Sequence, residues 1–123
     1  MTQPVALPTI DVHEADRRLR EGDGRPLLLD VREPNEFEAA RAPGAALVPT
    51  SQFMARVAEL PTDRPILVIC HSGGRSAAVT GYLVRTGRTD VANVAGGMAA
   101  WERAGLPTLH GRPAAGEGDL PTG

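Results

Sequence analysis

The chain has 123 residues, a formal net charge of −2 at pH 7 and no lysine, so that all 13 basic residues are arginine. At this length a single domain with its own hydrophobic core is expected, without help from disulfides or a structural metal. The charge gives no basic surface for nucleic acid, and the absence of lysine excludes a lysine Schiff base or a lysine general base.

Cys70 is the only cysteine, which excludes an internal disulfide and a zinc site built from several thiolates. A free thiol suits a reducing compartment. The first residues show no basic start followed by a long apolar run, and no stretch approaches the roughly 20 apolar residues of a membrane span. We therefore expect a cytoplasmic protein with no membrane partner.

The first half of the chain alternates helical and strand-like segments. A short extended segment leads into a helix with Asp11 as its N-cap and Glu14 as the capping-box partner, and Gly22 ends that helix. The apolar run 26–31 predicts a strand that is covered on both faces. The segments that follow are a helical turn at 34–37, a weak strand at 45–48 and a helix at 51–60 capped by Ser51.

The second half begins with the clearest strand, the β-branched apolar run 65–70. A glycine-containing loop then leads into a helix at 75–87, with Gly87 as its left-handed C-cap. A strand at 90–94 and a helix at 96–105 follow. The alternation of strands and helices with short links predicts an α/β fold around a mostly parallel sheet.

The C-terminal residues 109–123 are rich in proline and glycine and show no apolar periodicity. Such a composition is typical of a segment that packs weakly against the rest of a domain. We therefore expect a single domain over residues 1–108 and a flexible tail over residues 109–123.

A short loop carries the most distinctive chemistry, and its residues are Cys70, His71, Ser72, Gly73, Gly74, Arg75 and Ser76. In open α/β sheets, ligands bind at the carboxyl ends of strands, where this cysteine falls. Glycines let successive backbone N–H groups point inward, and a helix N-terminus and Arg75 add positive charge. This setting favours a thiolate or a persulfide. A free cysteine can also be an inert core residue, but inert cysteines do not need an electropositive loop.

Four sequence blocks resemble the rhodanese family in its single-domain form. They are LLLDVREPNEF at 27–37, APGAALVP at 42–49, CHSGGRS at 70–76 and NVAGGMAAWERAGLP at 93–107. Each block alone is weak, but their order and spacing over residues 8–108 are specific. The resemblance implies a rhodanese-like α/β fold, with a central, mostly parallel five-stranded sheet flanked by helices on both faces.

The same resemblance implies a sulfurtransferase. Cys70 would take the outer sulfur of a donor such as thiosulfate, release sulfite and carry the sulfur as a persulfide, which an acceptor thiol or cyanide would then remove. Such a double displacement predicts ping-pong kinetics. Backbone N–H groups of residues 71–75 would hold the persulfide, and Arg75 would brace the loop. The resemblance implies no metal or organic cofactor, and the partners would be a small sulfur donor and a thiol acceptor, either a small molecule or an acceptor protein.

Two positions depart from the family's pattern. His71 stands where the family often has arginine or lysine, and an imidazole is mostly neutral at pH 7. We therefore expect weaker binding of dianionic thiosulfate and a preference for a persulfide donor. An equally good interpretation is that His71 is a solvent-facing loop residue. Arg41 replaces a common histidine at a position that we interpret as structural.

Asp30 and Arg32 end a strand at the active edge of the predicted sheet. Single ion pairs near strand ends are mostly structural, so we expect these residues to support the loop, for example through an ion pair between Arg32 and Glu36. Trp101 is expected in the core, and Gly96–Gly97 is expected to permit a tight turn.

Three other functions stay open at this point. A cysteine phosphatase or arsenate reductase places five residues between its cysteine and arginine, whereas four separate Cys70 from Arg75, which favours a nest for a single sulfur atom. A regulatory or binding module without turnover typically lacks the cysteine, which is present here. A sulfur carrier that passes a persulfide to a partner protein is not separable by sequence from a free-standing enzyme.

Overall fold

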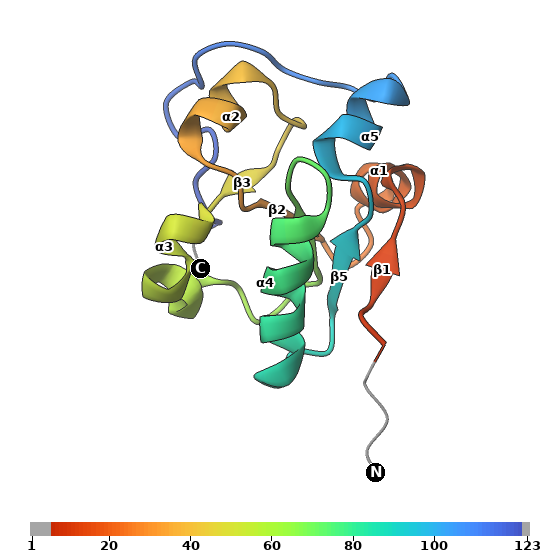
Figure 1. Ribbon diagram of the computed structural model, residues 1–123, viewed down its shortest axis with the longest axis vertical. Coiled ribbons are helices and arrows are strands. Elements are labelled where there is room, and N and C mark those ends of the chain that lie inside the picture. The colour runs from red at the N-terminus through yellow and green to blue at the C-terminus, as the bar shows by residue number, and fades with distance from the viewer. Residues whose placement is uncertain (1–5, 122–123) are drawn as a thin grey trace.

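A parallel β-sheet forms the centre of the computed structural model, which describes residues 6–121 (Figure 1). Its strands are β1 (Thr9–Ile10), β2 (Leu27–Asp30), β3 (Ala46–Leu47), β4 (Ile66–Ile69) and β5 (Val91–Val94). They lie in the order β1-β5-β4-β2-β3, and every neighbouring pair is parallel. The predicted five-stranded sheet is therefore confirmed. β4 is its central strand, and the carboxyl ends of all five strands share one edge.

Five α-helices and one 3-10 turn surround the sheet (Figure 1). The helices are α1 (Val12–Glu21), α2 (Pro34–Ala39), α3 (Thr50–Arg56), α4 (Gly74–Arg85) and α5 (Gly97–Arg103), and the 3-10 turn is η1 (Val57–Glu59). These counts refer to residues 6–121.

The sheet carries a hydrophobic layer on each face, because successive side chains of a strand point to opposite faces. The first layer packs α1, α2 and α5 against the sheet and includes Val12, Leu28, Phe37, Ile69 and Trp101. The second layer packs α3 and α4 against the other face and includes Leu29, Phe53, Val68, Cys70 and Leu83. The prediction of helices on both faces is confirmed. Cys70 follows Ile69 directly and therefore points into the α3–α4 layer.

The first helix follows its sequence signals closely. The Asp11 carboxylate accepts a hydrogen bond from the N–H of Glu14 at 2.8 Å, and Gly22 ends the helix with a left-handed φ of 72°. The expected return bond from the Glu14 side chain is not made. That carboxylate binds the guanidinium groups of Arg17 and Arg18 instead, which lie one turn further along the same face.

The predicted helix at 51–60 is shorter in the structure. It runs over Thr50–Arg56 and tightens into the 3-10 turn Val57–Glu59. Ser51 is not its cap, because the extended residue before the helix is Pro49. The Ser51 hydroxyl lies inside the first turn and donates to the Glu33 carboxylate at 2.8 Å. Ser51 therefore binds the N-cap residue of the preceding helix, α2, and does not cap its own.

The C-terminal segment, which we expect from its composition to be a flexible tail, makes specific contacts with the rest of the domain. Residues 109–121 return along α2 and pack beside β3 (Figure 1). The N–H of Leu47 donates to the carbonyl of Gly118 at 2.7 Å, and Arg41 forms an ion pair with Glu117. The segment shows no apolar periodicity because polar and backbone hydrogen bonds make most of these contacts.

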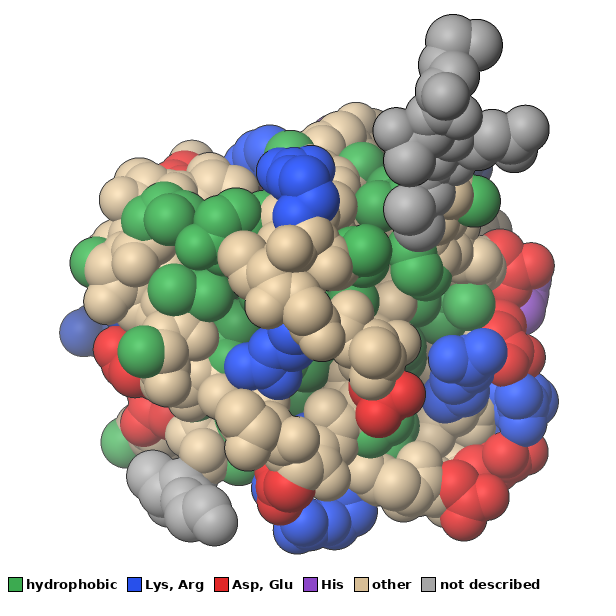
Figure 2. All heavy atoms as spheres, turned by 90° about the horizontal axis from the view of Figure 1, so that it is seen from below, with side chains coloured by type: hydrophobic (Ala, Val, Ile, Leu, Met, Phe, Trp, Pro, Cys, Tyr) green, Lys and Arg blue, Asp and Glu red, His purple; other side chains and the backbone are tan. Residues whose placement is uncertain are grey.

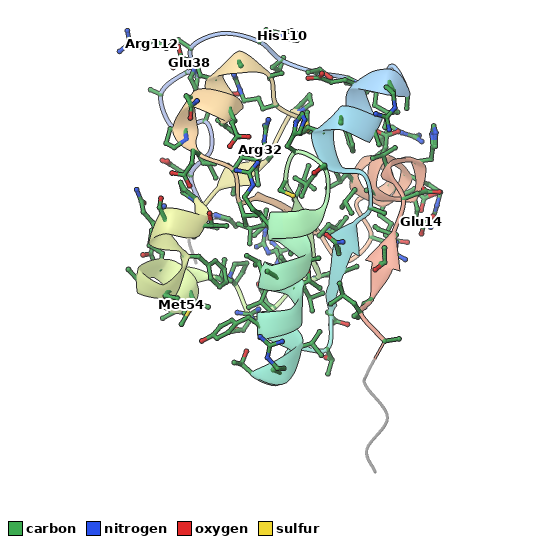
Figure 3. All side chains as sticks on the ribbon, viewed as in Figure 1. Glu14, Arg32, Glu38, Met54, His110 and Arg112 are labelled. Atoms are coloured by element: carbon green, nitrogen blue, oxygen red, sulfur yellow. The ribbon has the colours of Figure 1, made fainter. Side chains whose placement is uncertain are left out.

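The end of the molecule away from the Cys70 loop presents acidic and basic side chains interspersed with apolar ones (Figure 2). Met54, with 63% of its surface exposed, is the more exposed of two large apolar side chains that lie on the surface of the described residues, and it projects from α3 (Figure 3). Within residues 6–121, no helix combines the length and apolar character needed to cross a bilayer.

Candidate active site

The candidate nucleophile lies at the carboxyl end of the central strand. Cys70 follows β4 directly and precedes α4 by a short loop, as the sequence predicts. Its surface is 1% exposed, whereas the next residues, His71 and Ser72, are exposed. Because all the strands are parallel, Asp30 at the end of β2 reaches the same edge of the sheet. This edge is where open α/β sheets bind ligands.

Two hydrogen-bond donors approach the Cys70 sulfur. The N–H of Gly73 donates to Sγ at 3.1 Å, and the Ser76 hydroxyl lies 3.2 Å from Sγ. The same hydroxyl is 3.2 Å from the carbonyl of Gly73. Its single proton can serve only one acceptor at a time. With a thiolate at Cys70 the proton points to Sγ, and with a thiol it points to the carbonyl while the S–H donates to Ser76.

This arrangement changes the acidity of the thiol. Burial by itself raises the pKa of Cys70. Hydrogen bonds from the Ser76 side chain and from the backbone N–H groups of Ser76, Gly73 and Ser72 outweigh burial and hold the pKa below its ordinary value. Since the thiolate is the nucleophilic form of cysteine, the loop makes Cys70 more reactive near neutral pH than burial would allow.

The two loop glycines, Gly73 and Gly74, differ in backbone conformation. Gly73 adopts φ 110° at the N-cap of α4, a conformation that favours glycine. This turn aims its N–H at the Cys70 sulfur. Gly74 is already the first helical residue, and a Cβ built there would meet nothing within 4 Å. Of the two loop glycines, only Gly73 therefore has a left-handed conformation.

Arg75 ties the loop to α2. Its Nη1 and Nη2 atoms donate to the two carboxylate oxygens of Glu36 at 2.6 and 2.8 Å. This bidentate pair joins residues 39 positions apart. The Arg75 guanidinium, together with the backbone at Glu33, holds the pKa of Glu36 at about 2 despite partial burial. The predicted bracing role of Arg75 thus has a specific partner, which the sequence did not reveal.

Arg32 has a different partner from the one predicted. It forms an ion pair with Asp30 at 2.8 Å rather than with Glu36, and both side chains are buried. Its Nη2 also donates to the carbonyl of Ala40 at 2.7 Å. Figure 3 shows Arg32 below α2, at the end of the molecule that carries the loop. The expected pair with Glu36 is wrong, because Arg32 binds the Asp30 carboxylate and Glu36 binds Arg75.

The start of α5 holds the backbone of the loop through hydrogen bonds, a role that the sequence did not predict. The N–H groups of Met98 and Ala99 donate to the carbonyls of Cys70 and His71 at 2.8 and 2.9 Å. Gly97 lies between these backbones with φ 56°, and a Cβ there would be 2.4 Å from the Cys70 carbonyl oxygen. The paired glycines suggest a turn in the sequence, but the close approach depends on the tertiary fold.

A groove of about 330 Å3 opens beside the loop. Its lining comes from α2, the loop, α5 and the residues that follow β2 and α2, and consists of Arg32, Glu36, Ala39, Ala40, His71, Met98 and Glu102. His71 is the exposed loop residue in this set, while the carboxylates of two helices lie along the groove. The groove is large enough to hold a small molecule that presents an atom to the loop.

Comparison with known proteins places this architecture among sulfurtransferases. The family model described as the Rhodanese-like domain matches residues 11–104. A sulfurtransferase from Allochromatium vinosum is 37% identical over 100 residues, covering 81% of this chain and 92% of that protein.

Solved structures agree with this match. A rhodanese-related protein from Thermoplasma volcanium gives a TM-score of 0.72 at 29% identity, covering 83% of this chain and 97% of the other. A thiosulfate sulfurtransferase from Pseudomonas aeruginosa gives a TM-score of 0.75 at 28% identity, covering 86% of this chain but 21% of the other. The chain therefore belongs to the rhodanese-like domain family and has a sulfurtransferase-family role. The segment 109–121 lies outside the matched residues.

Proposed function

We propose that this protein transfers a sulfane sulfur through a persulfide on Cys70. The observation that carries the proposal is the pair of donors at the sulfur, the N–H of Gly73 and the hydroxyl of Ser76, in a loop at the start of α4. These groups stabilise a negative charge on sulfur. They favour the thiolate before the reaction and a persulfide after it.

The reaction has two displacement steps. In the first, the Cys70 thiolate attacks the outer sulfur of the donor. A new S–S bond forms, the S–S bond of the donor breaks, and the leaving group departs with the electron pair as sulfite or as a thiolate. In the second step an acceptor thiolate or cyanide attacks the outer sulfur of the persulfide and releases the Cys70 thiolate. No net oxidant is required, and the scheme predicts ping-pong kinetics.

The loop residues have separate proposed roles. Backbone N–H groups of His71, Ser72, Gly73, Gly74 and Arg75 hold the outer sulfur of the persulfide. The Ser76 hydroxyl stabilises Sγ, and the ion pair from Arg75 to α2 keeps the loop in place. The buried pair of Asp30 and Arg32 supports the same edge of the sheet without touching the reacting sulfur.

The surroundings of the loop favour a persulfide donor over thiosulfate. Glu102 lines the adjacent groove without an ion pair in the described residues, and His71 stands where the family often has a permanent cation. The compact double charge of thiosulfate is therefore disfavoured relative to a persulfide donor, whose reacting S–S group carries a single negative charge. Cys70 is 1% exposed, so a terminal sulfur on a narrow chain reaches it best. A reduced cysteine as nucleophile also suits the cytoplasm.

A donor panel tests this function. Wild-type protein and Cys70→Ser are assayed with thiosulfate, glutathione persulfide, mercaptopyruvate and a phosphate monoester. We expect ping-pong sulfur transfer from at least one sulfur donor, no phosphatase activity, and no turnover in Cys70→Ser. Phosphate release that depends on Cys70, or sulfur transfer that survives its removal, would contradict the proposal. Transfer to cyanide but to no small thiol would favour a protein as the acceptor.

A further inference from the structure

The C-terminal segment outside the family match is attached to the helix that braces the candidate active loop. Residues 109–121 cross from α5 to α2 and then run beside β3 (Figure 1). The chain thereby covers the edge strand of the sheet and the outer side of α2.

Arg41 is the main anchor of this segment. It is 3% exposed, and its guanidinium forms a two-pronged ion pair with Glu117. The same group donates to the carbonyl of Gly111 at 2.6 Å and lies 5.4 Å from the centre of the Phe37 ring. The pKa of Glu117 is lowered, chiefly by Arg41. This residue is the one that departs from the family's common histidine, and its partners lie in the segment beyond the family match.

Backbone bonds extend the attachment along α2 and β3. Arg41 and Leu109 exchange two backbone hydrogen bonds at 2.9 and 2.8 Å. The N–H of Gly111 donates to the carbonyl of Glu38 at 2.8 Å, and Leu47 donates to Gly118 at 2.7 Å. Figure 3 shows His110 and Arg112 on the segment above α2, near Glu38. The segment is therefore attached at the C-terminal end of α2 and at β3 rather than at one point.

The helix to which the segment is attached, α2, carries the residue that binds the active loop. Glu36 lies in α2, one residue before the Phe37 ring on which Arg41 packs, and it holds both nitrogens of Arg75. The carbonyl of Ala40, next to Arg41, accepts from Arg32 at the same edge of the sheet. A six-residue helix has little stability of its own, so its position depends on such tertiary contacts.

We propose that residues 109–121 form a C-terminal strap, anchored by Arg41 and Glu117, that positions α2 and thereby holds Glu36 against Arg75 of the active loop. Arg41 and Glu117 are positioning residues, since neither touches the reacting sulfur. The proposal rests on the proposed role of the Cys70 loop, but it concerns the geometry of that loop and not the identity of the sulfur donor.

Two measurements on the full chain test the strap. Hydrogen exchange at the Leu47 amide reports whether the strap is attached, because that N–H donates to Gly118. The pH profile of Cys70 alkylation by iodoacetamide reports the state of the loop and needs no sulfur transfer. The variants are Glu117→Ala and the milder Glu117→Gln, with Glu117→Asp as the conservative replacement. Asp119→Asn is the control, since its exposed carboxylate makes no hydrogen bond or ion pair within the described residues.

We expect faster Leu47 exchange and an alkylation midpoint raised by about 0.5 to 1 pH unit in Glu117→Ala. Glu117→Asp should bring the exchange rate and the alkylation midpoint part of the way back to the wild-type values. Asp119→Asn should leave both at the wild-type values. Faster exchange with an unchanged alkylation profile would overturn the positioning role. Unchanged exchange of the Leu47 amide in both Glu117→Ala and Glu117→Gln would overturn the role of Glu117 as an anchor of the strap. If Glu117→Ala does not fold, Glu117→Gln decides by the same criteria. If the wild-type protein transfers no sulfur while Glu117→Ala shows a shifted alkylation profile, the proposed function is contradicted and the positioning role of the strap is still supported.

Discussion

Arg75 of the loop and Glu36 of α2 form a bidentate ion pair, with N···O distances of 2.6 and 2.8 Å. The pair fixes both ends of the guanidinium and so restricts the backbone of Arg75, which lies in the first turn of α4. The neighbouring N–H groups are those that face the Cys70 sulfur. A contact between two charged side chains thereby determines the shape of a site built mainly from backbone.

The pair predicts a pH-dependent contribution to stability. Arg75 holds the pKa of Glu36 at about 2 against an ordinary value of 4.5, so the contribution is complete above pH 4.5 and is lost as the pH falls towards 2. Both side chains are about one-third exposed, and solvent screening limits the contribution to about 1 kcal/mol. Glu36→Gln should be less stable than wild type by this amount at pH 7.

Urea denaturation at several pH values measures this difference. The gap between wild type and Glu36→Gln should narrow between pH 4.5 and 2, because protonation removes the same charge in the wild type. Glu38→Gln is the matched control on the same helix, since the Glu38 carboxylate makes no ion pair within residues 6–121. A gap that stays constant down to pH 2 would show that the ion pair does not contribute as described.

The Ser76 hydroxyl should matter for the reactivity of Cys70. Ser76→Ala removes a donor to the thiolate, and loss of that donor raises the thiol's pKa. Alkylation of Cys70 at pH 7 should slow by about threefold to tenfold, with its midpoint moved to higher pH. Ser72→Ala is the control, because the Ser72 side chain is exposed. Equal alkylation profiles for Ser76→Ala and wild type would contradict the role of the hydroxyl.

Gly97 should tolerate no side chain. A Cβ there would lie 2.4 Å from the Cys70 carbonyl oxygen and 2.6 Å from that of His71, so α5 must move away from the loop. We expect Gly97→Ala to lose about 3 kcal/mol in urea denaturation. Gly105→Ala is the control, because its φ of 71° is similarly left-handed but a Cβ meets nothing within 4 Å.

The Gly105→Ala control should lose only about 1 kcal/mol, the cost of the backbone conformation itself. Similar losses in the two variants would mean that the close approach at Gly97 carries no energetic weight. In the folded fraction, Gly97→Ala should also alkylate more slowly at Cys70, since the carbonyls bound by α5 would no longer be held.

His71 should influence the choice of sulfur donor. His71→Arg places a permanent positive charge at the mouth of the loop. The KM for thiosulfate should fall by about threefold to tenfold at low salt and by less at high salt. His13→Arg adds the same charge on the exposed face of α1 and should have no effect. An unchanged KM in His71→Arg would support a solvent-facing role for this residue.

The sequence predicted those features that local residue patterns determine. Asp11 and Gly22 bound the first helix, and the apolar run before Cys70 identified the central strand. The two loop glycines also pointed to a backbone turn, although the left-handed conformation belongs to Gly73 alone. Such signals act over a few residues and are readable without a structure.

Long-range partners were not predictable in the same way. The sequence does not determine which carboxylate binds Arg32 or Arg75. In the structure Arg32 binds Asp30, and Arg75 binds Glu36, which lies 39 positions away. The segment 109–121 has a composition typical of disorder, yet Arg41 and Glu117 join it to α2 across 76 positions. Side-chain pairs of this kind depend on tertiary placement, which hydrophobic periodicity does not describe.

The intact mass of the protein after incubation with a sulfur donor tests the central claim most directly. Wild-type protein treated with thiosulfate or glutathione persulfide should gain the mass of one sulfur atom, localised to Cys70. Cyanide should remove that sulfur with formation of thiocyanate, and Cys70→Ser should never gain it. A wild-type protein that stays unmodified with both donors, or a Cys70→Ser variant that gains sulfur, would contradict the account.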